Sequence, residues 1–388
     1  MVNINNSPKM VPLLVDLGVF RQERFLLVDV GCSGGIHDSW RFFKDQLEAY
    51  GFDPQKSEIA KLSAAEENPN VRYFAYWVGL HNGHEFLNRK RAQQLEDSSY
   101  AAYFNPWMRL SCTCAMQLLR QPQTPYLQQR DAMVATAGDN LTDQKISISK
   151  FVREAGIKNI DMIKIDTDGS DLEVAISCED VVRECDVLGF MIEAGYIGSY
   201  RDTENNFPNI DRFMRKNGYC LFAMSVHRYS RADLPSQFEY PMLAKTVSGQ
   251  PIWGDLVYFR DAASSEYPKI WARELSTTKL LKLACLFELF SLPDCAAELI
   301  NKYSSKIADI VSPNKLLDLL TPPLHGESLS YEQYMKRFRE DPYSFYPRAA
   351  TASNLKNTPS NLSTSRKTHE KSSLEKRPSS YGMEGQKQ

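Results

Sequence analysis

A short turn of small residues, which follows an apolar run, is the first place where this chain could do chemistry. The stretch VDVGCSGGIHDSW, residues 28–40, places an aspartate two positions before its first glycine. Strand, tight turn and helix in this order bring backbone N–H groups and a helix start against a ligand. A second strand-like run ends in Asp53, whose carboxylate can accept hydrogen bonds from two ribose hydroxyls. The two segments together predict a nucleotide-type cofactor.

The spacing of small residues in the turn separates two kinds of cofactor. A dinucleotide fingerprint, G-x-G-x-x-G, started at Gly31 would need its later glycines at Ser33 and Ile36. Isoleucine is a poor fit there, because the third glycine lets the helix pack closely on the strand. The spacing Asp29-x-Gly31-x-Ser33-x-Gly35 instead resembles the loop of S-adenosylmethionine (SAM)-dependent methyltransferases. That resemblance implies that Asp29 orients the loop or meets the ammonium group of the cofactor.

Acidic residues end two later strands as well. The stretch NIDMIKIDTDGSDLEV, residues 159–174, contains a strand that ends in Asp166, with Asp168 shortly after it, and the next buried run ends in Glu193. Ligands gather at the carboxyl ends of parallel strands, so these side chains could face one pocket. They could act there as a base with its partner, or as oxygen ligands for magnesium. The metal-free version is favoured, because Glu193 is followed by Ala194 and not by a second carboxylate.

The ordered set of motifs resembles the FkbM-type family of methyltransferases. That family carries a Lys-Ile-Asp-x-Glu-Gly-x-Glu-x-Glu-like signature after its fourth strand, and the matching residues here are Lys164, Ile165, Asp166, Gly169 and Glu173. Asp168 replaces the usual glutamate, and Gly31-Cys32-Ser33-Gly34-Gly35 departs from the common Gly-Ala-Asn-x-Gly loop. The resemblance covers roughly residues 25–260 and includes YWVGLHNG, FMIEAG and FMRKNGYCLF.

The resemblance implies methyl transfer from SAM to an oxygen, usually a hydroxyl of a sugar, a glycan or another small metabolite. The expected cofactor-binding residues are Asp29, Gly31, Cys32, Ser33, Gly35, Asp53, Val78 and Gly79. The expected catalytic residues are Asp166, Glu193 and Asp168, and the histidines that could serve as base or line the cofactor site are His37, His81, His84 and His227. A non-catalytic binding protein on a methyltransferase fold is the first alternative. A nicotinamide-dependent oxidoreductase is the second, and the loop spacing argues against it.

The elements that must position these residues alternate along the chain. From Phe25 to about Arg260, β-branched runs alternate with helical patterns, which predicts a mainly parallel sheet with helices on both faces. The resemblance implies that this is a Rossmann-like class I methyltransferase fold. Its sheet is expected to be mostly parallel and seven-stranded, with a C-terminal antiparallel pair. A helix is expected after the turn, a strand over residues 71–78, and a capping box formed by Ser170 and Glu173.

Changes in composition predict the domain boundaries. A helical lead-in is expected over residues 1–24 and a methyltransferase domain over 25–260, interrupted by a polar, aromatic and glutamine-rich insertion at 79–145. Leucine- and isoleucine-rich helical patterns predict a helical appendage over 261–346. Residues 347–388 contain almost no large apolar residues and are expected to be disordered.

Composition excludes several classes of protein. Hydrophobic residues at 43% and charged residues at 24% of 388 are ordinary for a soluble globular protein. A formal net charge of -2 does not indicate nucleic acid or an anionic membrane as a partner, and no apolar stretch is long enough to span a bilayer. Neither a secretion signal nor a metal-ligand spacing of the eight cysteines is present, so a cytoplasmic enzyme with a small-molecule acceptor is expected.

Overall fold

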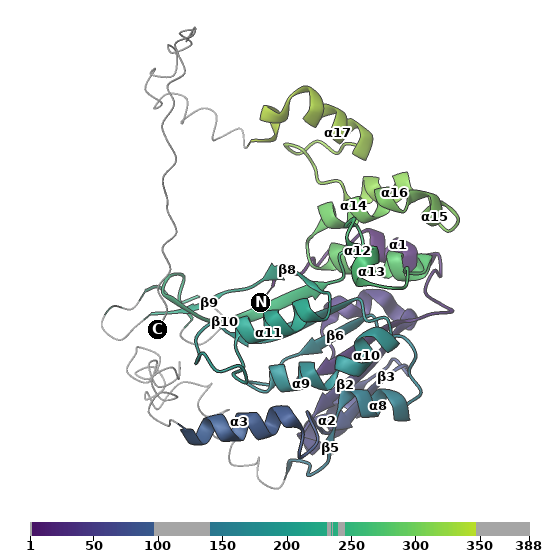
Figure 1. Ribbon diagram of the computed structural model, residues 1–388. Helices are drawn as coiled ribbons and strands as arrows, with labels where there is room; N and C mark the ends of the chain where they lie inside the picture. Colours follow the sequence, from purple (N-terminus) through teal and green to yellow (C-terminus); the bar gives the residue numbers. More distant parts are fainter. Residues whose placement is uncertain (1, 97–139, 231–233, 235, 240–244, 347–388) are drawn as a thin grey trace, which may run out of the picture. The chain divides into compact units, whose positions relative to one another are not determined.

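The computed structural model describes residues 2–96, 140–230, 234, 236–239 and 245–346 (Figure 1). Residues up to Pro322 form one compact unit, and a second unit begins at Pro323. The predicted tail at 347–388 and most of the predicted insertion, residues 97–139, lie outside the described residues. The domain division drawn from the sequence stays a prediction.

An eight-stranded sheet forms the centre of the first unit. Its order is β3-β2-β1-β6-β7-β10-β8, with β9 paired to β10. The strands are β1 Phe25–Val30, β2 Leu47–Asp53, β3 Val71–Ala75, β6 Met162–Ile165, β7 Gly189–Gly195, β8 Cys220–Met224, β9 His227–Tyr229 and β10 Gln250–Phe259. Strands β1, β2, β3, β6 and β7 run parallel, and β10 runs antiparallel to both β7 and β8. This is the strand order of the class I methyltransferase fold, so the predicted fold class is confirmed.

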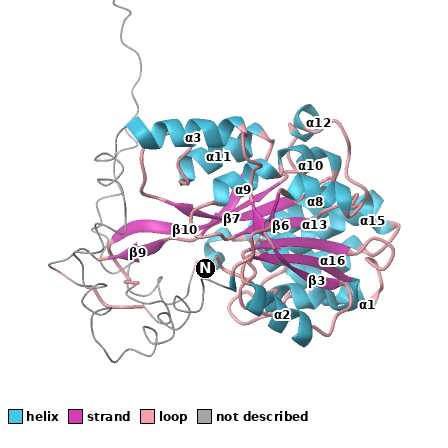
Figure 2. Cartoon of the chain, turned by 90° about the horizontal axis from the view of Figure 1, so that it is seen from below, coloured by secondary structure: helices cyan, strands magenta, loops and turns pink. Residues whose placement is uncertain are grey.

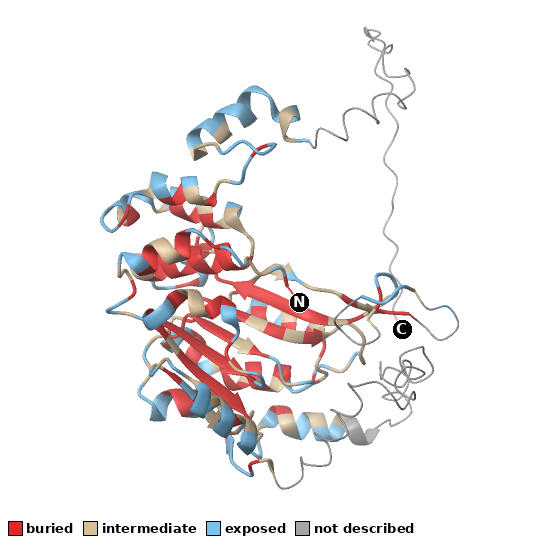
Figure 3. Cartoon of the chain, turned by 180° about the vertical axis from the view of Figure 1, so that it is seen from behind, coloured by how far each residue is buried: buried red, intermediate tan, exposed pale blue. Residues whose placement is uncertain are grey.

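Helices cover both faces of the sheet, which explains why its central strands are mostly apolar. Figure 2 shows α8 to α11 on one face and α2 on the other. These helices are α2 Lys56–Ala65, α8 Ile148–Glu154, α9 Asp171–Ser177, α10 Glu179–Glu184 and α11 Phe207–Lys216. Every residue of β1 is buried, and Figure 3 shows the buried residues concentrated in the sheet and the helices next to it.

The connection between β1 and β2 differs from the α-helix expected there. It is a 3-10 helix, η1 Asp38–Gln46. Its N-cap residue is His37, and it is interrupted at Lys44, where φ is 51°. Trp40 and Phe43 are three residues apart, a spacing that an α-helix and a 3-10 helix both place on one face. Both rings stack on Phe25 of β1, so tertiary packing holds the tighter helix.

The strand expected over residues 71–78 is divided. After β3 the chain leaves the main sheet, and β4 Trp77–Val78 pairs with β5 Lys145–Ile146 in a separate two-stranded sheet. The insertion between them contains an unexpected helix, α3 Glu85–Glu96. Its sequence is polar on most sides, so no apolar stripe marked it as a helix.

The C-terminal helices of the first unit pack beside the sheet. They are α12 Tyr267–Ile270, α13 Thr277–Leu289, α14 Pro293–Lys302, α15 Ser304–Ala308 and α16 Pro313–Leu320. Residues 279–289 of α13 are all buried, and Phe287 contacts Phe259 of β10. The Glu288 carboxylate accepts hydrogen bonds from three backbone amides at the start of α1 Met10–Asp16, at 2.7 to 2.9 Å. A carboxylate at a helix N-terminus satisfies donors that the helix cannot pair.

The described part of the second unit contains α17 Tyr331–Glu340 and a 3-10 turn, η2 Pro342–Phe345. Ser330 and Gln333 form a capping box at the start of α17, and Phe345 packs on Tyr334 and Phe338. Across the described ranges of both units, none of the helices combines the length and the apolar character that a bilayer span needs.

Candidate functional site

Four acidic residues lie at the carboxyl ends of four adjacent strands. Asp53 ends β2, Asp29 is the penultimate residue of β1, Asp166 directly follows β6, and Glu193 lies near the end of β7. Because these strands are neighbours in the sheet, the structure brings the four predicted positions to one edge. This edge is the place where open α/β sheets bind ligands.

The turn after β1 is fixed between its two neighbouring strands. The amides of Gly31 and Cys32 donate to the carbonyl of Phe52 in β2, at 2.8 and 3.1 Å. On the other side Gly31 lies so close to β6 that a Cβ there would be 1.7 Å from the carbonyl oxygen of Asp166. Its φ is +79°, and Gly35 has φ +92°. Only glycine fits at position 31, because both the space and the backbone conformation exclude a side chain.

The two residues within the turn differ in what they can offer a ligand. Cys32 is buried and packs beside Gly51 of β2, where a Cβ would lie 2.9 Å from its sulfur. Burial raises the pKa of the Cys32 thiol, so the side chain stays neutral and only its backbone can take part. Ser33, in contrast, is exposed at the tip of the turn.

Lys164 joins the turn to the acidic residue after β6. Its Nζ donates to the carbonyl of Gly31 at 2.8 Å and lies 3.2 Å from Asp29 Oδ1 and 3.3 Å from Asp166 Oδ2. Burial opposes the charge of this lysine, but the two carboxylates raise its pKa. Burial raises the pKa of Asp29 to about 6, although Lys164 acts in the opposite direction. Sequence reasoning identified Lys164 only as a motif match, and it assigned this lysine no role.

Asp166 affects the ionisation of the neighbouring Glu193 carboxyl group. The pKa of Glu193 is raised to about 9, first by burial, then by a hydrogen bond to Asp166 and by repulsion from that carboxylate. The side chain of Asp166 is 45% exposed and has Lys164 beside it. At neutral pH, Glu193 therefore keeps its proton.

Asp168 lies two residues further along, in an unusual backbone conformation. Its φ is 52°, in the left-handed region that side chains other than glycine, asparagine and aspartate rarely adopt. Burial, and then repulsion from Asp166, raise the pKa of its carboxyl group. Such conformations are held only where the surroundings determine them, and they concentrate at functional sites.

The cofactor-side residues lie around β2 and β4. Asp53 is 5% exposed, its Oδ1 accepts a hydrogen bond from the amide of Gln55 at 2.8 Å, and burial raises its pKa. Val78 ends β4, and the amide of Gly79 donates to Ile146 in β5 at 3.0 Å. A Cβ on Gly79 would lie 2.7 Å from Glu173 Oε1, so glycine lets α9 approach this segment.

The expected capping box at the start of α9 is not formed. The Ser170 side chain makes no cap hydrogen bond, and Glu173 accepts a hydrogen bond from the amide of Leu80 at 3.2 Å. The buried carboxylate of Asp171 instead binds the amides of Thr167 and Gly169, at 2.7 and 3.2 Å. The sequence analysis gave Asp171 no role, although it stands near the next acidic position of the family signature.

The histidines contribute to helix caps and ring contacts within the described part of the chain. His37 is the N-cap residue of η1, where its Nδ1 accepts from the amide of Ser39. His227 is 1% exposed and stacks on Trp253 at 4.0 Å, and burial lowers its pKa to about 4, so it is neutral. His84 accepts a hydrogen bond from the Phe86 amide at the start of α3, and its ring contacts that of His81.

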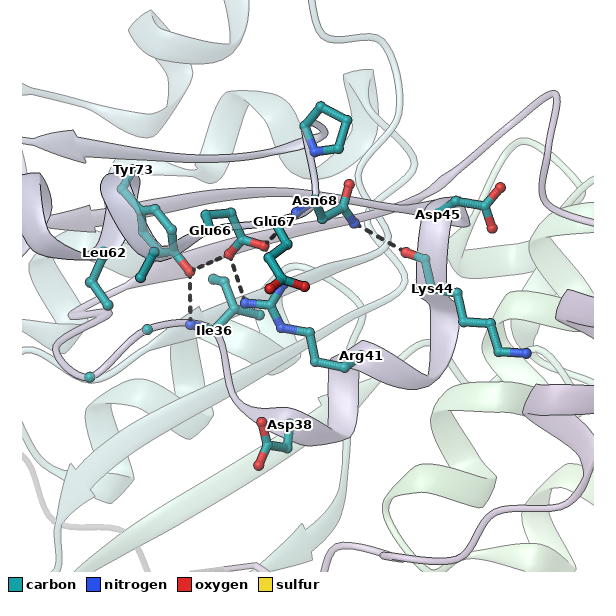
Figure 4. Close-up of a pocket in the computed structure, with 14 residues that line it drawn as sticks. Ile36, Asp38, Arg41, Lys44, Asp45, Leu62, Glu66, Glu67, Asn68 and Tyr73 are labelled. Atoms are coloured by element: carbon teal, nitrogen blue, oxygen red, sulfur yellow. Dashed lines mark hydrogen bonds and ion pairs between the residues drawn. The ribbon is translucent and has the colours of Figure 1, made fainter.

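A groove of about 630 Å³ opens beside the turn (Figure 4). Arg41 and Glu66 form a two-bond ion pair along it, each bond 2.7 Å long, and Glu66 also accepts from the hydroxyl of Tyr73. The lining includes Gly34 and Gly35 but none of the four acidic residues at the strand ends. This groove is therefore a neighbour of the predicted catalytic carboxylates and does not contain them. Within the described residues, no group of three His, Cys, Asp or Glu side chains is arranged to hold a metal ion.

Solved structures that resemble the chain include three methyltransferases, and the likeness is distant. A TehB-like SAM-dependent methyltransferase from Corynebacterium glutamicum has 11% identity over 66% of this chain and 90% of its own, with a TM-score of 0.26. A precorrin-6y C5,15-methyltransferase from Geobacter metallireducens has 11% identity, covers 67% and 94%, and scores 0.26. A magnesium protoporphyrin IX methyltransferase from Synechocystis, solved with bound SAM, has 10% identity, covers 64% and 77%, and scores 0.23. Scores this low carry no further weight, and no curated protein matches the sequence.

The strand order and the turn after β1 define a class I, SAM-dependent methyltransferase fold. Residues 34–221 match the family model of the methyltransferase FkbM domain. This match confirms the resemblance to the FkbM methyltransferase family that was drawn from the motifs.

Proposed function

We propose that the chain transfers a methyl group from SAM to a hydroxyl oxygen of a sugar, a glycan or another small polyhydroxylated molecule. The single observation that supports oxygen as the acceptor is the Asp166–Glu193 pair. It combines an exposed carboxylate with a neighbouring carboxyl group that keeps its proton at neutral pH. An alkyl hydroxyl is a poor nucleophile until a base takes its proton, and such a base is what Asp166 offers.

The residues of the cofactor side fit SAM. Gly31 lets the backbone pass without a side chain, and Ser33 and Gly35 follow at the tip of the turn. Asp53 uses Oδ1 for the local bond to Gln55, which leaves Oδ2 to accept ribose hydroxyls. Val78 and Gly79 would border the adenine ring, while Cys32 contributes backbone alone. When bound, SAM supplies an electrophilic methyl group on a sulfonium sulfur.

The acceptor-side residues then have separate tasks. Asp166 takes the proton of the acceptor hydroxyl while that oxygen forms its bond to the methyl carbon and the carbon–sulfur bond breaks. Lys164 holds Asp166 and the Gly31 carbonyl at a fixed separation, so the base and the cofactor turn stay aligned. Glu193 and Asp168 add acidic groups beside the base. Magnesium held by Asp166 and Glu193 is the alternative use of the same carboxylates.

The proposal is tested with methyl-labelled SAM and a panel of sugars, polyols, phenols and amines, with product mapping by mass spectrometry. We expect the label on an oxygen, with transfer unchanged by a chelator. Label on nitrogen would contradict the acceptor class, and loss of transfer on chelation with recovery on adding magnesium would support the metal version. Binding of S-adenosylhomocysteine (SAH) without turnover of any acceptor would favour a binding protein. A rise in melting temperature with NAD and not with SAH would contradict the methyltransferase assignment.

A further inference from the structure

We infer that Asp171 and Asn205 form a latch that positions the catalytic carboxylates, which makes Asp171 a positioning residue of the proposed methyl transfer. The inference rests on the proposed function. Asp171 is the first residue of α9 and has no exposed surface. Its carboxylate is buried and both of its oxygens accept hydrogen bonds, so it acts through the turn that joins it to Asp166 and not as the base itself.

The Asp171 carboxylate accepts four hydrogen bonds from described residues. Oδ1 accepts from the amide and the hydroxyl of Thr167, at 2.7 and 3.0 Å. Oδ2 accepts from the amide of Gly169 at 3.2 Å and from Nδ2 of Asn205 at 2.9 Å. Burial raises the pKa of Asp171, and these four bonds oppose that effect. A carboxylate with both oxygens used in this way has a fixed orientation.

The turn that these bonds hold is the one that carries Asp168. Asp168 and Gly169 have φ values of 52° and 114°, two consecutive positive values. An aspartate adopts the left-handed conformation at a cost, so it needs bonds on both sides to stay there. The amides of Thr167 and Gly169, immediately before and after Asp168, are the two that Asp171 binds.

Asn205 extends the latch to the segment that follows β7. Its Oδ1 accepts from the amide of Leu172 in α9 at 2.8 Å, so one side chain bonds to both the carboxylate and the helix backbone. The next residue, Asn206, forms a bridge with Gly195 at the end of β7, two residues after Glu193. Asp171 and Asn205 therefore connect the segments that follow both members of the Asp166–Glu193 pair.

Helix α3 also contacts the segment that follows β7, through the side chain of Gln93. The amide group of Gln93 donates to Asp202 at 2.7 Å, and its oxygen accepts from the hydroxyl of Thr203 at 2.6 Å. The segment from 195 to 206 is thus held at α9 and at α3. We therefore expect loss of the latch to change the position of Asp166 and Glu193 relative to the acceptor more than it changes overall stability. Alignment of the acceptor with the reacting groups affects turnover.

The test compares Asp171→Asn with the exchange variant Asp171→Asn/Asn205→Asp. In the single variant one acceptor oxygen becomes an NH₂ donor, so two of the four bonds are lost whichever way the amide turns. In the exchange variant that NH₂ can donate to the new carboxylate at position 205, whose second oxygen can still accept from Leu172. Asp180→Asn is the control, because Asp180 is an exposed aspartate in the first turn of the next helix.

For Asp171→Asn we expect kcat to fall at least about 10-fold, with the KM for SAM and the Kd for SAH within about threefold of wild type. The exchange variant should recover at least about a third of the lost activity, and the control should keep wild-type kcat. Unchanged kcat in Asp171→Asn would overturn the inference. Equal losses of kcat, SAH affinity and melting temperature, without recovery on exchange, would also overturn it.

Amide hydrogen exchange separates failure of the latch from failure of the proposed function. The latch predicts faster exchange at Thr167, Gly169 and Leu172 in Asp171→Asn, with other buried amides unchanged. This readout does not need activity. If wild-type protein methylates no acceptor, the proposed function fails while the exchange data still decide the latch. Unaltered exchange at these three amides in Asp171→Asn would overturn it.

Discussion

Strand β6 has a cluster of lysine and acidic side chains at each of its ends, and the two clusters are built differently. At the amino end, Asp161 is fully buried and lies 2.8 Å from Lys279 Nζ and 2.9 Å from Lys282 Nζ. At the carboxyl end, Lys164 lies 3.2 Å from Asp29 and 3.3 Å from Asp166. The first cluster joins the sheet to helix α13, and the second borders the cofactor turn.

Charge balance explains why similar residue types hold structure at one end and can do chemistry at the other. At the amino end, two lysines face Asp161 and Glu23, and they also donate to backbone carbonyls of residues that precede β1, β6 and β7. Burial opposes the charge of Asp161, but both lysines lower its pKa. At the carboxyl end, Lys164 lies beside both Asp29 and Asp166. Burial and the nearby acidic groups, Asp166 first among them, keep the Glu193 carboxyl protonated.

The largest effect is expected from breaking the cluster at the amino end. Asp161→Asn leaves two buried lysines facing an amide, and loss of one partner of a buried ion pair costs about 3–5 kcal/mol of unfolding free energy. Urea denaturation measures this loss. Asp166→Asn is the matched control at the other end of the same strand, and as an exposed residue it should change stability by at most about 0.5 kcal/mol. Equal destabilisation by the two variants would remove the distinction between the clusters.

The second prediction concerns turnover at the carboxyl end. Asp166→Asn should lower kcat by at least about 100-fold, because an amide cannot accept the hydroxyl proton. The Kd for SAH, measured by calorimetry, should stay within about threefold, since Asp53 and the turn still bind the cofactor. Full activity in this variant would make Asp166 a structural carboxylate, like Asp161.

The third prediction addresses the cofactor side. Asp53→Ala should weaken SAH binding by about 10-fold or more, because loss of a hydrogen bond to a charged group costs about 1.5–3 kcal/mol. The melting temperature without ligand should change little. Among the described residues, the Asp53 side chain makes one hydrogen bond, which it accepts from the nearby amide of Gln55. Unaltered SAH affinity would place the ribose elsewhere.

The smallest effect is a pH dependence of stability that depends on Glu193. Its ordinary pKa of 4.5 is raised to about 9 in the folded protein, so unfolded chains release this proton at lower pH than folded chains do. The folded state therefore loses stability as pH rises from about 4.5 toward about 9. Glu193→Gln cannot lose a proton and should gain in melting temperature relative to wild type, by about 2 °C or more, between pH 5 and pH 8. A constant difference across this range would show that Glu193 is ionised at neutral pH.

Much of the fold could be predicted from the sequence, because buried parallel strands are largely apolar runs, and several of them have an acidic residue at the carboxyl end. Asp53, Asp166 and Glu193 were found in this way. The contacts of Lys164 could not be predicted, since Asp29 is 135 positions away in the chain and becomes its neighbour only through the register of β1 and β6. The capping box was wrong for a local reason. Ser170 has φ -109° and ψ 11°, outside the extended conformation of an N-cap residue, and the Glu173 side chain accepts from the amide of Leu80.

A crystal structure of the protein with SAH tests the central claim most directly. The account predicts ribose hydroxyls on Asp53, the amino-acid part of SAH along the turn from Gly31 to Gly35, and the sulfur facing the side of the site that holds Asp166. SAH in the groove lined by Arg41 and Glu66, with the ends of β2 and β6 untouched, would contradict it.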